Sequence, residues 1–323
     1  MHPYSTLTPD VVVEAVEALG HRCDGRVLAL NSYENRVYQV GREDAAPVVV
    51  KFYRPGRWST PAILEEHAFA LELAAAEVPV VAPEVRDGRS LFESHGFRYA
   101  VYPRQGGRWP EFATREDRAW MGRFLGRIHA VGRTRSFRHR ARLDWRTMGV
   151  ETVEWLLGQG WIPPHLEAAY ESVAGDAIAL VEQRLEEAAP LRTLRLHGDC
   201  HPGNVLWTDD GPHFVDLDDC MTGPAVQDLW MLVSGRPEEM RAQLEDFLEG
   251  YQDFADFDWH ELRLVEPLRT LRILHYAGWL ARRWDDPAFP RAFPWFEEPK
   301  YWEQHVLDLR EQISAMEENW GHS

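Results

Sequence analysis

The chain has 323 residues, of which 45% are hydrophobic, so it is long enough for two domains and apolar enough to form sizeable cores. Asp and Glu number 52 against 35 Lys and Arg, a net charge of −17, which argues against a nucleic-acid partner because phosphate backbones require a basic surface. No apolar run is long enough to cross a bilayer, the N-terminus lacks a secretory-signal pattern, and the three cysteines show no pairing or metal-binding pattern. We therefore expect a cytoplasmic monomer that does not contact a membrane.

The first hundred residues predict a short helix followed by an antiparallel sheet. Thr8-Pro9-Asp10 supplies an N-cap and an early proline before an apolar stripe that ends at Gly20. From Arg26 onward the residues alternate or are β-branched, which is typical of strands, in VLALNSYENRVYQVG, PVVVKFYRPG and, later, FRYAVYPR.

The turn between the first two predicted strands is polar and runs from Asn31 to Arg36. It contains no G-x-G-x-x-G sequence, but its backbone N–H groups and the Ser32 hydroxyl are able to cover a phosphate, as turn amides do in anion-binding nests. An ordinary hairpin turn is the alternative. If Ser32 lies beside a transferable phosphate, it is also a candidate for autophosphorylation.

Lys51 ends a β-branched run, so its side chain is expected on the inner face of the sheet. A buried ammonium group needs an opposing charge, and a helix that begins at Ser59 brings Glu65 and Glu66 within range. We favour Glu66 as the partner of Lys51. The alternative is a lysine that reaches solvent from a strand end, with both glutamates solvated.

Helical periodicity dominates from Thr114 onward. WMGRFLGRIHAVG predicts a core helix with an apolar stripe and with His129 as a packing residue, and two further helices are expected between Leu143 and Pro190. The apolar stripe consists of Trp120, Phe124, Leu125 and Ile128.

The segment LHGDCHPGNVLW, followed by HFVDLDD, carries the chemistry. Asp199 and Asn204 have the Asp-x-x-x-x-Asn spacing of a kinase catalytic loop, and Asp216 follows on a second short strand. Phosphoryl transfer needs positioning and charge neutralisation, so Asp199 is the candidate for accepting the hydroxyl proton, and Asn204 and Asp216 are candidate Mg²⁺ ligands. The alternative, a turn and a solvated strand end, does not explain why both halves occur in this order and at this separation.

Two features follow the catalytic segment. After Gly223-Pro224 a helix is expected from Ala225, and Asp228 within it is predicted to accept backbone N–H bonds and so brace the catalytic loop. The final third is helical, with basic and aromatic residues near one helix face that form either an acceptor groove or an ordinary core and solvated stripe. These residues are Arg269, Arg272, Tyr276, Trp279 and Arg283.

With Lys51, the acidic helix, HGDCHPGN and VDLDD in this order, the chain resembles the choline kinase and aminoglycoside phosphotransferase superfamily. More closely, it is similar to the bacterial stress response kinase A family. The stretches that carry this resemblance include LNSYENRVYQV, VVKFYRPGRW, ILEEHAFAL, LRLHGDCHPGN, GPAVQDLWML and RRWDDPAFPRAFPW.

The resemblance implies an α+β, two-lobed protein-kinase-like fold. An N-terminal nucleotide-binding lobe would comprise residues 1–103, and a mainly helical catalytic and acceptor-binding lobe residues 104–323. It implies a serine/threonine protein kinase that uses ATP and Mg²⁺ in stress survival, with Asp199 and Asp216 as catalytic residues. By analogy, backbone groups near Val101, Tyr102 and Pro103 bind the adenine edge, while Ser32, Lys51 and Glu66 serve the phosphates.

The acceptor stays open at this point. His201 stands where a serine/threonine kinase carries lysine, and the phosphate loop is not glycine-rich, as in small-molecule phosphotransferases of the superfamily. A kinase of a small hydroxylated molecule, such as choline, homoserine or an aminoglycoside, is therefore the second hypothesis. A nucleotide-binding pseudokinase is the third, and it is disfavoured because every expected site residue is present.

Overall fold

The computed structural model describes residues 3–318, which fall into two compact units. The first unit combines the chain up to residue 141 with residues 194–222 and 231–257, and the second combines residues 142–193, 223–230 and the chain from residue 258. The predicted lobe boundary at residue 103 separates a nucleotide-binding lobe from a catalytic lobe, whereas the two units are defined by contacts within the fold. The predicted boundary stays a prediction.

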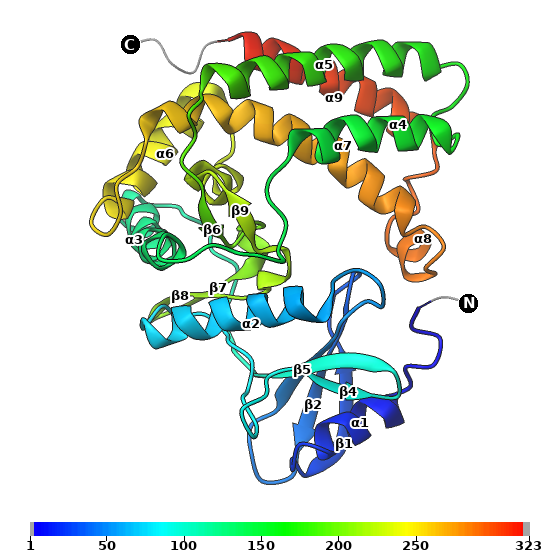
Figure 1. The fold of residues 1–323 in the computed structure, drawn as a ribbon, viewed down its shortest axis with the longest axis vertical. Helices are drawn as coiled ribbons and strands as arrows, with labels where there is room; N and C mark the ends of the chain where they lie inside the picture. Colours follow the sequence, from blue (N-terminus) through cyan, green and yellow to red (C-terminus); the bar gives the residue numbers. More distant parts are fainter. Residues whose placement is uncertain (1–2, 319–323) are drawn as a thin grey trace. The chain divides into compact units, whose positions relative to one another are not determined.

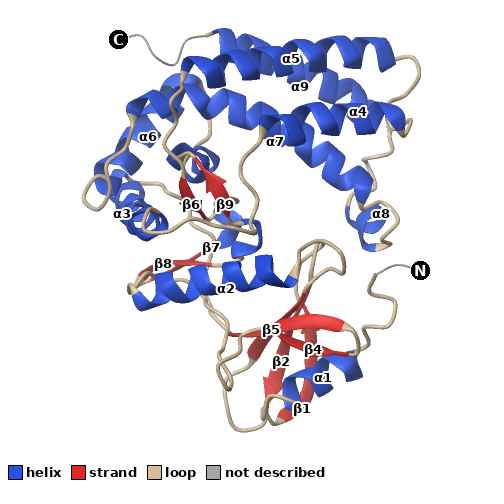
Figure 2. Ribbon diagram, in the orientation of Figure 1, coloured by secondary structure: helices blue, strands red, loops and turns tan. Residues whose placement is uncertain are grey.

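The first unit contains a five-stranded antiparallel sheet in the order β1-β2-β3-β5-β4. Figures 1 and 2 show this sheet, which is blue to cyan in Figure 1. The antiparallel N-terminal sheet predicted from the sequence is therefore confirmed. In its register Lys51 lies between Val37 of β2 and Ala100 of β5. The strands are β1 (Cys23–Ala29), β2 (Arg36–Arg42), β3 (Val48–Phe52), β4 (Phe92–Ser94) and β5 (Phe97–Pro103).

Two helices pack against this sheet. Helix α1 (Pro9–Glu17) begins at Thr8, whose hydroxyl caps the Val11 amide, and its Val12 and Val16 are buried with residues of β2, β3 and β5. Helix α2 (Thr60–Ala75) begins at Ser59 as predicted, and its Ile63 packs against Tyr53 and Ala100. Because Ala100 neighbours Lys51 in the sheet, α2 lies on the face toward which Lys51 points.

Helices α3 (Arg115–Gly132) and α6 (Pro237–Tyr251) pack almost backbone to backbone. A Cβ atom on Gly122 would lie 1.9 Å from the carbonyl oxygen of Phe247, so only glycine permits this approach. Within the predicted stripe of α3, Leu125 and Ile128 are buried, whereas Trp120 and Phe124 are half-buried. His129 is a packing residue as predicted: it is buried, and its Nδ1 lies 3.0 Å from the Tyr251 hydroxyl.

Short strands complete the first unit. Strand β6 (Leu194–Leu196) pairs with β9 (Met221–Gly223), and β7 (Val205–Thr208) forms a hairpin with β8 (Gly211–Phe214). Two single 3₁₀ turns, Pro202–Asn204 and Leu217–Asp219, follow β6 and β8. These turns carry the catalytic segment expected from the sequence.

The second unit is helical (Figure 2). It contains a π-helical turn (Arg146–Val150), α4 (Glu151–Gly158), α5 (Glu167–Glu187), α7 (Val265–Arg282), α8 (Ala288–Ala292) and α9 (Pro299–Glu317), with a 3₁₀ segment at Trp259–Leu264.

The prediction of a helix from Ala225 is wrong in the type of helix, because the chain forms two 3₁₀ turns there, Ala225–Asp228 and Trp230–Leu232. A tertiary bond fixes the first of these turns: the Val226 amide donates to the buried Glu261 carboxylate at 2.9 Å.

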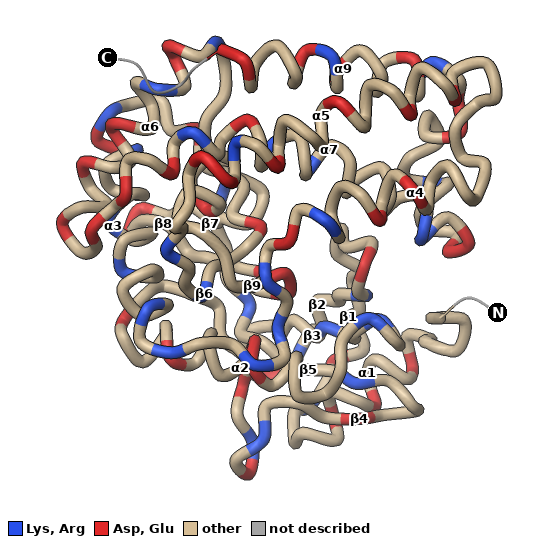
Figure 3. Tube along the Cα trace, turned by 45° about the horizontal axis from the view of Figure 1, so that its top comes forward, with Lys and Arg blue, Asp and Glu red and all other residues tan. Residues whose placement is uncertain are grey.

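Acidic and basic residues are interspersed along the chain in both units (Figure 3). Within residues 3–318, no helix combines the length and the apolarity that a membrane-spanning helix requires.

A buried histidine lies in the aromatic core of the second unit. The His305 ring is stacked between Tyr170 and Tyr301, with centroid distances of 5.7 Å to each. Only 3% of His305 is exposed, and burial lowers the pKa of its imidazole to about 4. His305 is therefore neutral in the folded protein at neutral pH.

This burial predicts acid sensitivity. Because the pKa of His305 is depressed in the folded state, the unfolded chain takes up a proton as the pH falls through about 6.5, and the folded chain does not. Lowering the pH from 7 to 5 should therefore cost about 2 kcal/mol of unfolding free energy through His305. Urea unfolding followed by circular dichroism at several pH values checks this.

The variant His305→Phe keeps an aromatic ring between the two tyrosines and removes the titrating group. Its unfolding free energy should depend less steeply on pH between 7 and 5 than that of the unmodified protein. Equal slopes for the two proteins would contradict the assignment.

Candidate active site

The catalytic segment depends on a close approach that only glycine permits. Gly198 has φ +87°, and a Cβ atom there would lie 2.1 Å from the carbonyl oxygen of Asp219. The preceding residue, His197, is buried, and its Nε2 lies 2.9 Å from the carbonyl oxygen of Val215, to which it donates. The segments that carry Asp199 and Asp216 are thereby held against each other.

Asp199, His201 and Asn204 lie together on this segment. The Asn204 side-chain amide donates to the carbonyl oxygen of Asp199 at 3.0 Å, so its Oδ1 is the end of the side chain left for a cation. His201 Nδ1 accepts from the Gly203 amide at 3.0 Å, which places the ring proton on Nε2, 3.5 Å from Asp199 Oδ2. His201 therefore faces Asp199.

Asp216 has an unusual backbone conformation. Its φ of 58° and ψ of 65° lie in the left-handed region, which costs free energy for a residue other than glycine and which often marks functional sites. Its carboxylate is half exposed and lies 3.3 Å from Lys51 Nζ. The strained backbone thus directs a carboxylate toward the lysine.

Lys51 is buried among three carboxylates, which lie within 3.3 Å of its Nζ. The distances are 3.0 Å to Glu66, 3.2 Å to Asp218 and 3.3 Å to Asp216. Burial disfavours the ammonium form, but the carboxylates outweigh it and raise the pKa of Lys51 well above its usual value. Lys51 is therefore firmly cationic, and the alternative of a solvated lysine is wrong.

Glu66 is the partner that the sequence analysis favoured. Glu65 has a different role, because its carboxylate accepts the backbone N–H groups of Arg138, His139 and Arg140 at 2.7, 2.7 and 3.0 Å. These bonds tie α2 to the loop after α3. The two neighbouring glutamates thus anchor the helix to two different segments.

Asp218 is the main site residue that the sequence analysis did not assign to the phosphate site. It is 2% exposed, and its Oδ2 accepts from Asn35 Nδ2 at 3.0 Å and from the Arg57 guanidinium. Burial alone would raise the pKa of Asp218, but Lys51, Arg57 and Arg140 hold it well below its usual range. The available sequence signal was its spacing, two residues after Asp216 in VDLDD.

A cavity of about 280 Å³ opens beside these charges. Apolar residues form one part of its wall, among them Leu30, Val37, Val49, Val81 and Leu206. Predicted site residues form the other part: Ser32, Lys51, Glu66, Tyr102, Pro103, Asn204 and Asp216. The sequence analysis therefore identified most of the polar residues that line the cavity.

Three of the predicted site residues do not line the cavity wall: Asp199, Val101 and Asp228. Val101 packs on the α1 face of the sheet, and its carbonyl oxygen accepts from the Glu84 amide at 2.7 Å. Asp228 is fully buried within the second unit. The predicted roles of Asp199 as the base, of Val101 at the adenine edge and of Asp228 as a brace stay predictions.

Tyr102 belongs to a chain of hydrogen bonds in the inner wall. Its hydroxyl lies 3.1 Å from the Tyr53 hydroxyl, which lies 2.7 Å from His67 Nε2, and His67 Nδ1 lies 2.8 Å from Ser90 Oγ. Burial lowers the pKa of His67 to about 3, so the ring is neutral and donates from only one nitrogen. This chain fixes the position of the Tyr102 ring at the cavity.

The donor set suits a cation that arrives with a phosphate. The described residues hold no cluster of three or more His, Cys, Asp and Glu side chains able to bind an ion by themselves. Asn204 and Asp216 supply two hard oxygen donors at the cavity wall. Mg²⁺ typically takes one or two protein ligands and completes its shell with phosphate oxygens and water.

Known proteins share both the sequence and the fold. Residues 26–265 match the phosphotransferase enzyme family. Stress response kinase A of Escherichia coli K12 is 46% identical over 98% of this chain and 95% of its own length, and serine/threonine protein kinase RdoA of Salmonella typhimurium is 44% identical over the same shares. A solved structure of the amicoumacin kinase hAmiN with AMP-PNP and Ca²⁺ is 19% identical, covers 93% of each chain and gives a TM-score of 0.69.

The structural likeness confirms the predicted α+β kinase-like fold, and the sequence matches extend over nearly the whole chain. The chain thus belongs to the phosphotransferase enzyme family and, within it, to the stress response kinase A family of ATP-dependent phosphotransferases.

Proposed function

We propose that the protein is a Mg²⁺- and ATP-dependent serine/threonine protein kinase that acts as a cytoplasmic monomer in a bacterial stress response. The observation that carries this proposal is the identity of 44–46% with stress response kinase A and with serine/threonine protein kinase RdoA over 98% of the chain. The site supports it, because a lysine, an amide and several carboxylates converge around one cavity.

Each residue then has a separate task. Asp199 accepts the proton of the attacking hydroxyl group, and the neighbouring His201 N–H fixes the orientation of its carboxylate. Asn204 and Asp216 hold Mg²⁺, which neutralises phosphate charge when it is bound. Lys51, held by Glu66, binds phosphate oxygens and orients the γ-phosphoryl group.

The remaining nucleotide contacts come from the cavity wall. Ser32 and the backbone of its loop cover the phosphates, and the chain near Val101, Tyr102 and Pro103 meets the adenine edge between apolar residues of the sheet and β7. Asp228 braces the catalytic loop without touching the substrate. Ser32 is also the candidate for autophosphorylation, because this residue lines the cavity.

A kinase of a small hydroxylated molecule is the second candidate. It is supported by His201 at the position where protein kinases carry lysine and by a fold shared with an amicoumacin kinase. A nucleotide-binding pseudokinase has less support, because Lys51, Glu66, Asp199, Asn204 and Asp216 are all present.

The first prediction of this proposal distinguishes the role of Asp199 as the base from the role of Asp216 as a metal ligand. Asp199→Ala should keep its affinity for Mg-ATP within about 3-fold and lose phosphoryl transfer by about 10³-fold, since general-base catalysis contributes about 10²–10⁴. Asp216→Ala should instead weaken Mg-nucleotide binding by about 10-fold or more, because one of only two protein ligands is lost. Isothermal titration with Mg-AMP-PNP and single-turnover assays measure the two effects.

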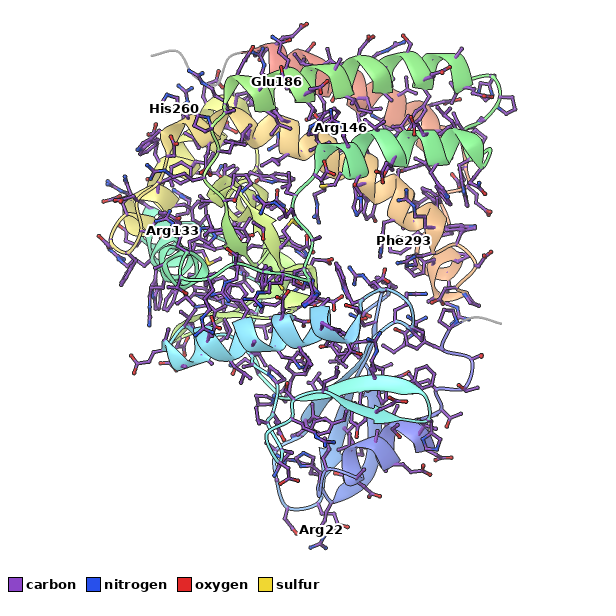
Figure 4. All side chains as sticks on the ribbon, in the orientation of Figure 1. Arg22, Arg133, Arg146, Glu186, His260 and Phe293 are labelled. Atoms are coloured by element: carbon purple, nitrogen blue, oxygen red, sulfur yellow. The ribbon has the colours of Figure 1, made fainter. Side chains whose placement is uncertain are left out.

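Arg22→Gln is the matched control for these variants. The Arg22 side chain is exposed and forms an ion pair with Glu43, and Figure 4 shows it at the end of the sheet away from α2. The Arg22→Gln variant should bind and turn over Mg-ATP like the unmodified protein. Equal loss of Mg-nucleotide binding in Asp199→Ala and Asp216→Ala would refute the division of roles.

The second prediction concerns the acceptor. Incubation with Mg-ATP labelled on its γ-phosphate should label the protein itself and a generic protein substrate on serine or threonine, and Asp199→Ala should abolish the label. Mass spectrometry should find phosphate on Ser32, and Ser32→Ala should lose that site. Label confined to small hydroxylated molecules would support the second candidate, and nucleotide binding without any transfer would support the third.

A further inference from the structure

The loop over the cavity, residues 31–36, is held by side chains rather than left free. Asn35 in this loop is 3% exposed, and both ends of its amide are bonded: Nδ2 donates to Asp218 Oδ2 at 3.0 Å, and Oδ1 accepts from the Arg54 amide at 3.1 Å. The donor end must face Asp218 because a carboxylate can only accept. Asn35 therefore joins the loop to the segment that carries Asp216.

The loop backbone is bonded as well. The Arg54 guanidinium donates to the carbonyl oxygens of Glu34 at 3.0 Å and Tyr33 at 3.2 Å, and the Tyr4 hydroxyl donates to that of Glu34 at 3.1 Å. Arg36 donates to the Tyr33 carbonyl oxygen at 2.8 Å. No glycine occurs between Asn31 and Arg36, so the loop also lacks the backbone freedom of a glycine-rich loop.

Arg57 provides a second link, from the turn before α2. Its guanidinium donates to the carboxylates of both Asp218 and Asp219, and its Nε lies 3.7 Å from Glu34 Oε1 in the loop. The Arg57 side chain is 15% exposed, so these charges are only weakly screened by solvent. One cation thus bridges the loop and the metal-binding segment.

We infer that Asn35 and Arg57, together with Asp218, form a latch that fixes the phosphate-covering loop before nucleotide binds. Here "latch" means these three side chains. A loop that is already ordered loses little conformational freedom on binding, so the latch contributes to nucleotide affinity through preorganisation. Asn35 and Arg57 are positioning residues, and the inference rests on the proposal that this loop covers the phosphates.

Asn35→Asp is the sharpest test, because it preserves size and replaces the donor that faces Asp218 with a second carboxylate. Like charges repel strongly at a buried site, so the Kd for Mg-AMP-PNP should rise by about 10-fold or more. Turnover at saturating nucleotide should fall by less than about 3-fold, since neither Asp199 nor the metal ligands change. Gln39→Glu on β2 is the matched control, because it also replaces a side-chain amide with a carboxylate. The Gln39 side-chain oxygen accepts a hydrogen bond from the Arg104 guanidinium, which tolerates a negative charge, so this variant should leave the Kd for Mg-AMP-PNP unchanged.

Hydrogen exchange of the backbone amides of residues 31–36 distinguishes a latch on this loop from a general effect on the stability of the fold. In the unmodified protein, residues 31–36 should be protected without nucleotide, and Mg-AMP-PNP should add little protection. In Asn35→Asp and the milder Asn35→Ala, exchange should be faster without nucleotide and should slow when nucleotide binds. Arg57→Gln should shift both readouts in the same direction, and thermal unfolding confirms that each variant is folded.

Two results would overturn the latch. One is rapid exchange of residues 31–36 in the unmodified protein that becomes slow only when nucleotide binds. The other is an unchanged nucleotide Kd in a folded Asn35→Asp variant. Failure of the proposed function looks different, because it concerns the acceptor: the protein would still bind Mg-AMP-PNP without transferring phosphate to protein.

Discussion

The positive charge of Lys51, buried against the carboxylates of Glu66, Asp216 and Asp218, is the interaction on which the site depends. Transferring such charges from water costs several kcal/mol each, and only a complete set of partners offsets that cost. The charges come from three parts of the chain: β3 supplies Lys51, α2 supplies Glu66, and the segment after β8 supplies both aspartates. The charge cluster therefore fixes the relative positions of these elements within the first unit.

Local signals were enough to predict much of this arrangement. The cap at Ser59, the β-branched run before Lys51 and the Asp-x-x-x-x-Asn spacing each depend on residues that are close in sequence. They led to the antiparallel sheet and to helix α2. No local signal separated Glu66, the favoured partner of Lys51, from Glu65; the folded structure selects Glu66, and adjacent residues on a helix point about 100° apart.

The parts that were not predicted depend on contacts between distant residues. Asn35 and Asp218 are separated by 183 positions, and the sequence alone does not reveal that the amide of one faces the carboxylate of the other. Arg57 lies in a turn rich in arginine, where a solvated side chain is the ordinary expectation. The 3₁₀ turns after Pro224 escaped prediction for a similar reason, since the distant Glu261 carboxylate bonds the Val226 amide.

The contact between Gly198 and the Asp219 carbonyl oxygen makes the two halves of the site inseparable. Adding a single methyl group at residue 198 would push apart the segment with the proposed base, Asp199, and the segment with the proposed metal ligand, Asp216, although it alters neither side chain. Such a variant would behave like the simultaneous loss of two functional groups. The activity of this site therefore depends on a glycine that has no functional group of its own.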